Sequence, residues 1–467
     1  MKQTRLRPVL RLLTCTGILV ACGDGANSPT GAAEFGSPAR NENNSAVGAG
    51  TPQNTPEATG TPPNTPETTG AGTRTPEGNP QVTLPPGGSP AATGSSTPVT
   101  PATPVTPATP AVPATPPVAV SPGEPEPTDC VIPRPAAAPI GYGAAATGGG
   151  TATAVLVSSF AEAEAALASY RAAFKAGTAS ALVVRYTGSF DYSAITDVCA
   201  QHTKDPQLLE LKEMNNVTFE GAPGSSANFG IHINRAKNVI VRNMTMGLLP
   251  GGDGSDAITV EGNGTNGDVE NVWIDHNELF SSTKDDCDGA GDTEFDGLID
   301  IKKGARFITI SYNYLHDHQK TGLIGFSDSD DTERYVTFHH NRYENVVSRT
   351  PLQRFGYTHI FNNYYGQITS SGINVRMGGV ALIESNFFEN AANPVTSRYS
   401  DGLGFWDLRS NHVGPGITWT TESDTLANAE TWQSTIAFPP AELSYSYTPD
   451  RAGCVKQIVL ATAGARL

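Results

Sequence analysis

Short runs of β-branched and apolar residues recur along the chain at a nearly regular spacing, and this repeat constrains the fold most. The runs are Asn216–Phe219, Asn238–Val241, Asn271–Ile274, Phe307–Ile310, Tyr335–Phe338, Thr358–Phe361 and Val380–Ile383. Their first residues lie 22, 33, 36, 28, 23 and 22 positions apart. A period of about 22 residues with occasional expansions is typical of a solenoid whose coils stack strand on strand. The repeat therefore predicts an all-β parallel β-helix; strands of a β-sandwich, the alternative, recur about every 8–12 residues.

Asparagines follow these runs and support the same prediction. They are Asn243, Asn277, Asn313, Asn341, Asn363, Asn386 and Asn411. Stacked coils would bring such residues to one corner, where their amides can bond to one another as a ladder. The expanded coils between Asn243 and Asn341 predict long loops on one side of the solenoid, where a groove for a polymer would form.

Two segments precede the repeat. Residues 159–176 have alanines and apolar residues at helical spacing, which predicts a helix that caps the solenoid. Residues 141–150 are rich in glycine, but neither a phosphate-loop lysine nor a dinucleotide fingerprint accompanies them. We therefore interpret the glycines as a structural turn.

The first 128 residues differ from the rest in composition. Lys2, Arg5, Arg7 and Arg11 precede a short apolar run that ends at Leu19–Cys22, which predicts a lipoprotein signal peptide over residues 1–22 with lipidation of Cys22. An ordinary signal peptide with an incidental cysteine is the alternative. Residues 23–128 are rich in proline and threonine and cannot bury a core, so we expect a disordered linker before a domain at 129–467. The protein would then be secreted and tethered to the cell envelope.

The remaining cysteines predict disulfides. Cys15 and Cys22 belong to the export segment, which leaves Cys130, Cys199, Cys287 and Cys454. An even number in an exported domain favours two disulfides, and the four are too dispersed to favour a metal site.

Acidic and basic residues lie side by side in the stretch from Glu294 to Arg354. Asp296 and Asp300 are four positions apart, so in an extended chain they share a side and can converge on a hard cation if the backbone bends at Gly297. Lys320, Arg349 and Arg354 follow and predict binding of an anion. The formal net charge is −16, so attraction of a polyanion must be local to this cluster.

Four motifs resemble those of calcium-dependent pectate lyases, from about Tyr142 to Cys454. They are Val272–His276, Asp296–Lys302, His318–Lys320, and Arg349-Thr-Pro351-Leu-Gln-Arg354 leading into Asn362–Tyr365. The resemblance implies a right-handed parallel β-helix. It also implies an extracellular enzyme that uses Ca²⁺ to cleave polygalacturonate, the demethylated form of pectin, by β-elimination.

The resemblance assigns roles to individual residues. It implies a base, Arg349; calcium ligands Asp256, Asp296 and Asp300; and substrate-binding cations Lys302, Lys320, Arg354 and Arg376. Some relatives have a further acid where this chain has Gly254, with Asp253 beside it. The resemblance pairs Cys199 with Cys287, and the positions of Cys130 and Cys454 at the two ends of the domain favour the second pair. We expect a monomer without a nucleic-acid partner and place the Asp275–His276 motif in the core.

Two other functions remain open from the sequence alone. A glycoside hydrolase on the same solenoid needs paired carboxylates without a required metal, for which Asp285 and Asp286 are the candidates. A tethered sugar-binding protein with an inactive site is the other, although the complete set of cations beside Arg349 counts against it.

Overall fold

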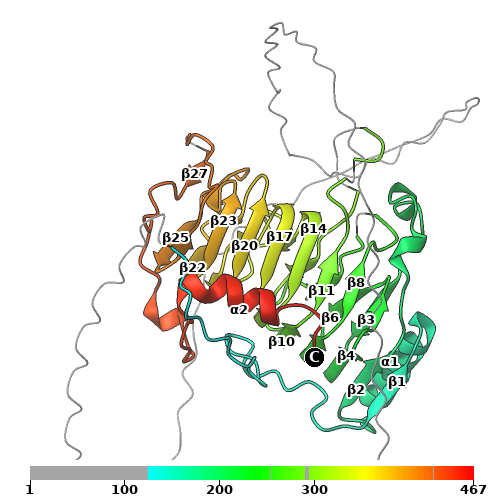
Figure 1. The fold of residues 1–467 in the computed structure, drawn as a ribbon. Helices are drawn as coiled ribbons and strands as arrows, with labels where there is room; N and C mark the ends of the chain where they lie inside the picture. The colour runs from blue at the N-terminus through cyan, green and yellow to red at the C-terminus, as the bar shows by residue number, and fades with distance from the viewer. Residues whose placement is uncertain (1–124, 253, 285, 290–293, 424) are drawn as a thin grey trace, which may run out of the picture. The chain divides into compact units, whose positions relative to one another are not determined.

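Three sheets of short strands form the walls of the computed structural model, which describes residues 125–252, 254–284, 286–289, 294–423 and 425–467 (Figure 1). From β4 onward, each coil passes through the ten-stranded, the eight-stranded and the nine-stranded sheet in turn. Neighbouring strands pair in parallel, apart from β24 and β27, which pair antiparallel. The molecule is a right-handed parallel β-helix, so the predicted fold class is confirmed.

Each sheet contains one strand from nearly every coil, stacked in chain order. The ten-stranded sheet contains β1 (Ala154–Val157), β2 (Leu182–Tyr186), β4 (Asn215–Gly221), β7 (Lys237–Arg242), β10 (Val269–Asp275), β13 (Ala305–Ser311), β16 (Tyr335–His339), β19 (Tyr357–Phe361), β22 (Val380–Glu384) and β25 (Phe405–Arg409). The eight-stranded sheet contains β5 (Ser226–Ala227), β8 (Thr245–Gly247), β11 (Glu278–Phe280), β14 (Tyr314–Lys320), β17 (Arg342–Ser348), β20 (Tyr364–Ile368), β23 (Phe387–Ala391) and β26 (His412–Val413). The nine-stranded sheet contains β3 (Leu208–Lys212), β6 (Gly230–Asn234), β9 (Ile258–Glu261), β12 (Ile299–Lys302), β15 (Gly322–Ile324), β18 (Leu352–Arg354), β21 (Ile373–Arg376), β24 (Val395–Ser397) and β27 (Ala427–Asn428).

The core consists of apolar columns that run from coil to coil. In the ten-stranded sheet, Val217, Val239, Val272, Ile308 and Val336 lie level with one another and are fully buried. Alternate residues of a strand point to opposite faces, so each strand contributes every second residue to these columns. All seven runs recognised in the sequence belong to this sheet.

An amide ladder follows the corner between the ten-stranded and the eight-stranded sheet. Each asparagine from Asn277 to Asn386 donates to the side-chain oxygen of the next, at 2.9–3.0 Å, through Asn277, Asn313, Asn341, Asn363, Asn386 and Asn411. The prediction is wrong for Asn243, which lies one position earlier in its coil. Its side chain instead donates to the carbonyls of Gly221 and Leu467, at 2.8 and 3.1 Å, and Met244 takes the ladder position.

Helices lie at the first coils and beside the eight-stranded sheet (Figure 1). Helix α1 (Phe160–Lys175) confirms the predicted cap; Ser159 caps it by accepting from Glu162 N, and Leu167 and Tyr170 are buried against the core. Helix α2 (Val455–Thr462) was not predicted and packs on Tyr364 and Phe387. The described residues also form short 3₁₀ turns: η1 (Tyr192–Ala194), η2 (Cys199–Gln201), η3 (Pro440–Glu442) and η4 (Ala452–Cys454).

The glycine-rich segment lies across the outer face of the ten-stranded sheet. Gly143 N donates to Thr309 Oγ1 at 3.0 Å, and Gly149 N donates to Thr218 Oγ1 at 2.9 Å. A Cβ on Gly143 would lie 2.6 Å from Thr309 N, so only glycine allows this close approach. The glycines are structural, as the sequence predicted.

Both predicted disulfides, Cys130–Cys454 and Cys199–Cys287, are present. The predicted signal peptide, Cys22 and nearly all of the linker lie outside the described residues. Within the described residues, none of the helices has the length and hydrophobicity that a membrane span requires.

Candidate active site

Five of the predicted site residues lie at the corner where the chain passes from the eight-stranded to the nine-stranded sheet. Asp256 lies two residues before β9, Asp296 lies three residues before β12, and Asp300 lies in β12. Lys320 ends β14, and Arg349 lies in the connection from β17 to β18. Successive coils are about 4.8 Å apart, so residues far apart in the sequence become neighbours here.

Three carboxylates converge at this corner. One oxygen from each of Asp256, Asp296 and Asp300 lies within 4.8 Å of the others. Asp256 and Asp300 are each 1% exposed. Backbone amides position them: Gly297 N donates to Asp256 Oδ1 at 2.8 Å and Gly254 N donates to Asp296 Oδ2 at 2.8 Å. This is a preorganised cluster of hard oxygen donors.

Lys302 provides the nearest positive charge to the cluster. Its Nζ lies 2.8 Å from Asp256 Oδ2 and 3.0 Å from Asp300 Oδ2. Burial opposes its charge, but the carboxylates of Asp300 and Asp256 outweigh burial and raise the pKa of Lys302 above its usual value. In this structure Lys302 therefore acts as a counter-ion to the acids.

The single positive charge of Lys302 does not neutralise the three carboxylates. Burial, together with the neighbouring carboxylates Asp300 and Asp296, raises the pKa of Asp256 well above its usual value. Burial also raises the pKa of Asp300, where Lys302 offsets it only in part. For Asp296 burial is outweighed by Lys302 and Lys320, which lower its pKa. A divalent cation would relieve this repulsion, so the three residues fit a calcium ion by charge, ligand type and convergence.

A row of cations continues from the cluster along the nine-stranded sheet. Arg354 and Arg376 end successive strands and lie level with each other. Lys302, Gly325 and Arg354 occupy equivalent positions at the ends of the successive strands β12, β15 and β18, so Gly325 interrupts the row of cations. A Cβ on Gly325 would lie 3.1 Å from Arg354 Cβ. The cationic side therefore extends over several coils toward the C-terminal end of the solenoid.

Arg354 and Arg349 differ in their surroundings. Arg354 Nε donates to Asp328 Oδ1 at 2.6 Å and its Nη1 donates to the Gly325 carbonyl at 2.9 Å, so this guanidinium is held in place. Arg349 has a left-handed backbone conformation at the corner, with φ +66°. Its positive charge favours the ionised form of Asp300. Among the described residues no group forms a hydrogen bond or ion pair with the Arg349 side chain, which leaves its nitrogens available.

Three features of the site were not predicted. Thr259 Oγ1 donates to Asp256 Oδ2 at 2.7 Å, Asp328 holds Arg354, and backbone amides of Gly254 and Gly297 orient the acids. Thr259 lies three residues from Asp256, which is a local signal that could have found it. Asp328 lies 26 residues before Arg354 in a loop, and only the folded chain brings the two together.

The histidines near the site are structural. Burial lowers the pKa of His318 to about 3, and its Nε2 lies 3.1 Å from the Lys320 carbonyl, so it is a neutral ring that supports the end of β14. Asp275 and His276 are each 2% exposed and hydrogen-bonded to each other at 2.7 Å at the end of β10, in the ten-stranded sheet. Their predicted place in the core is confirmed. The alternative hydrolase pair has no described geometry, because Asp285 lies outside the described residues.

Comparison with known proteins agrees with this geometry. The model of the pectate lyase family matches residues 131–466. Pectate lyase B of Dickeya chrysanthemi is 47% identical over 304 residues, which are 62% of this chain and 78% of that protein. The structure of pectate lyase II from Xanthomonas campestris is 51% identical, with a TM-score of 0.66 over 70% of this chain and 98% of that chain.

Two solved structures of pectate lyase C are also similar. One is an arginine-to-lysine variant in complex with pentagalacturonic acid, and the other is the Erwinia chrysanthemi protein with Ca²⁺. Each is 41% identical, with a TM-score of 0.63, and covers 69% of this chain and 95% of its own. The fold and the site define an enzyme of the polysaccharide lyase class. The chain belongs to the pectate lyase family.

Proposed function

We propose that this enzyme cleaves α-1,4-linked polygalacturonate by calcium-assisted β-elimination and releases oligogalacturonates with 4,5-unsaturated ends. The observation that carries the proposal is the convergence of Asp256, Asp296 and Asp300 at one end of a row of lysine and arginine side chains. The row of cations can bind a polyanionic substrate, and the cluster of acids can bind a divalent ion. Pectin degradation would be the physiological outcome.

The acid cluster is the proposed calcium site. Bound to Asp256, Asp296 and Asp300, the ion would draw charge from a substrate carboxylate and make the adjacent C5 proton more acidic. Lys302 already bonds to two of these acids and would stay within reach of a substrate carboxylate at the same place. A methyl ester has no comparable ligand, so demethylated substrate should be preferred to highly methylated pectin.

Arg349 is the proposed base that removes the C5 proton, and the glycosidic oxygen at C4 leaves with the bonding electrons. An arginine ordinarily stays protonated, so the reaction should be favoured at alkaline pH. Arg349 suits the role because no described protein group occupies its nitrogens. Arg354, held by Asp328, is suited to fix a substrate carboxylate, with Lys320 and Arg376 as further contacts.

One assay tests the proposal. Purified protein is incubated with polygalacturonate, with either calcium or a chelator, and the ultraviolet absorbance of 4,5-unsaturated ends is followed. We expect an absorbance increase that requires calcium. New reducing ends without this absorbance, unaffected by the chelator, would instead indicate a hydrolase.

We also propose that the enzyme acts as a monomer, secreted and attached to the cell envelope through lipidated Cys22, with residues 23–128 as a disordered tether. Support comes from the sequence alone: Leu19–Cys22 ends an apolar run, and a proline-rich segment follows. Replacing Cys22 with serine should release the enzyme or block its processing, as measured by cell fractionation. Unchanged fractionation would exclude the anchor, and light scattering of the purified enzyme would measure its oligomeric state.

A further inference from the structure

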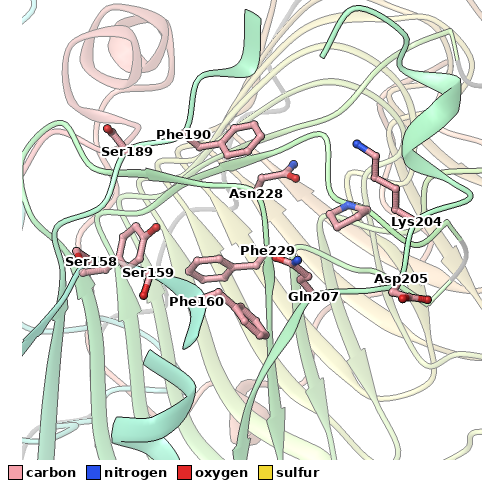
Figure 2. Close-up of a pocket in the computed structure, with 12 residues that line it drawn as sticks. Ser158, Ser159, Phe160, Ser189, Phe190, Lys204, Asp205, Gln207, Asn228 and Phe229 are labelled. Carbon is pink, nitrogen blue, oxygen red and sulfur yellow. The ribbon is translucent and has the colours of Figure 1, made fainter. Parts of the chain in front are cut away.

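A pocket of about 600 Å³ lies at the first coils of the solenoid, outside the site described above (Figure 2). Phe160, Phe190 and Phe229 give it an aromatic side. Figure 2 shows Gln207 and Asn228 on the same pocket, with Lys204 and Asp205 beside them. The aromatic rings support one another, since Phe229 contacts Phe160 and Tyr186 edge to face with ring centroids 5.5 and 5.3 Å apart.

The pocket shares a wall with the loop that carries Asp256. Pro250 lines the pocket and lies on this loop. Gly251 N donates to the Gln201 carbonyl at 3.0 Å, and Asn228 Nδ2 donates to the carbonyls of Gly247 and Leu248 at 2.7 and 2.5 Å. These bonds fix the pocket relative to the acid cluster.

Strand register places the pocket on the axis of the active site. Ile231 of β6 is level with Ile258 of β9, and a Cβ on Gly230 would lie 2.4 Å from the Asp256 carbonyl oxygen. Phe229 therefore lies on the coil next to that of Asp256. Arg354 and Arg376 belong to later coils, on the opposite side of the acids. A polymer that runs along the nine-stranded sheet from these arginines across the acids would reach the pocket next.

The charge of the pocket differs from that of the cation row. Its charged lining residues are Lys204 and Asp205, which cancel, and Lys204 Nζ donates to Gln201 Oε1. Aromatic faces stack on the apolar face of a sugar ring, and amides bond to hydroxyl or ester oxygens. A free carboxylate would lie near Asp205 without an excess of positive charge. A methyl ester would place an apolar group against Phe160 and Phe190, which are partly exposed.

We propose that this pocket binds a methyl-esterified galacturonate unit of the same pectin chain whose free-acid units occupy the calcium and arginine site. The inference rests on the proposed function. It makes the enzyme selective for the boundary between demethylated and esterified stretches. The cleavage site still requires free carboxylates, so highly methylated pectin remains a poor substrate.

The test measures kcat/KM from the absorbance of unsaturated ends on two substrates, fully demethylated polygalacturonate and pectin of intermediate methyl esterification. Phe190→Ala removes an aromatic face, and Gln207→Ala removes an exposed amide without touching the core. The readout is kcat/KM on esterified pectin divided by that on polygalacturonate. We expect this ratio to fall roughly three- to tenfold in Phe190→Ala, the range of one aromatic contact, and less in Gln207→Ala.

Phe405→Ala is the matched control, because Phe405 is an exposed phenylalanine, 41% accessible, at the start of β25 in the ten-stranded sheet. Its ratio should equal that of the wild type. An active wild-type enzyme with unchanged ratios in both pocket variants would overturn the pocket inference and leave the lyase function intact. A wild-type enzyme without calcium-dependent activity on polygalacturonate would overturn the proposed function itself. Should Phe190→Ala fail to fold, Gln207→Ala decides the result.

Discussion

The charge of Asp300 has two opposite effects. It lowers stability, because Asp300 is buried beside other acids, and it contributes to the proposed calcium site. Asp300→Asn removes one charge and keeps the size of the side chain. We expect the calcium concentration for half-maximal activity to rise by roughly tenfold or more, the scale of loss at metal sites. Without calcium the variant should melt at the same temperature as the wild type or higher, because the cost of burying a carboxylate and its repulsion with Asp296 are both relieved.

Two readouts therefore check this prediction: calcium titration of activity, and thermal unfolding with and without calcium. Asp317→Asn is the control, because the Asp317 side chain in β14 is 48% exposed and lies outside the acid cluster. An unchanged calcium requirement in Asp300→Asn would show that Asp300 is not a ligand.

Arg349 and Arg354 should respond differently to the same substitution. Arg349→Lys keeps the charge but moves the proposed base, so kcat should fall by about 100-fold or more while polygalacturonate binding survives. Arg354→Lys loses the fixed geometry that Asp328 gives the guanidinium, and should mainly raise KM, by about tenfold. Steady-state kinetics at saturating calcium across alkaline pH measures both. Retained turnover in Arg349→Lys with collapse in Arg354→Lys would reverse the two assignments.

Sequence spacing predicted part of this site and family resemblance predicted more. Asp296 and Asp300 are close enough in the chain for their spacing to suggest a shared cation. Asp256 is 40 residues earlier, and only the stacking of β9 on β12 brings it to them. Asp328 and the pocket around Phe229 could not be predicted, because their neighbours come from other coils and no local pattern marks them.

Among the elements of the fold, the amide ladder should contribute strongly to the free energy of unfolding. Asn313 is fully buried; it donates to the Ile274 carbonyl at 3.0 Å and to Asn341 Oδ1 at 2.9 Å. Asn313→Ala leaves buried backbone groups without partners, which should cost about 3 kcal/mol or more of unfolding free energy. Chemical denaturation measures the loss. Asn266→Ala, at an exposed loop residue, should cost less than about 0.5 kcal/mol.

The sequence repeat revealed seven strands of the ten-stranded sheet and none of the other two sheets. Strands of the ten-stranded sheet have up to seven residues and face a covered outer surface, so their apolar runs are continuous. Strands of the nine-stranded sheet such as β15 and β18 have three residues, too few for a recognisable pattern. The ladder prediction was wrong for Asn243 because this residue lies one position before the ladder position, and the sequence does not reveal the offset until the coils are aligned in the structure.

For the whole molecule, one surface cluster makes stability depend on pH. His232 bonds through its two ring nitrogens to Glu210 at 2.9 Å and Glu261 at 3.1 Å, and Asn234 Nδ2 lies 3.3 Å away. Burial alone would lower the pKa of His232, but the two glutamates outweigh it and raise it to about 9. Hydrogen bonding to His232, together with Lys303, lowers the pKa of Glu261 to about 2.

The stabilisation by His232 is complete below its ordinary pKa of about 6.5 and is lost as pH rises through about 9. That by Glu261 is complete above its ordinary pKa of about 4.5 and is lost as pH falls toward 2. His232→Gln should therefore lower the melting temperature most between pH 4.5 and 6.5, corresponding to roughly 2 kcal/mol after solvent screening. Melting curves at pH 6 and pH 10 check this; equal differences at both would contradict it.

The antiparallel strand β27 gives the solenoid a definite last coil. A parallel coil leaves unpaired backbone groups that another coil, or another molecule, can extend, much as a crystal face accepts the next layer. β27 pairs with β24 in the opposite direction, so the next position no longer matches the repeat. Helix α1 lies against β2 and β3 and covers the first coils, so that end of the solenoid is closed as well. The enzyme is therefore a stack of similar coils that ends at both sides and does not extend into a fibre.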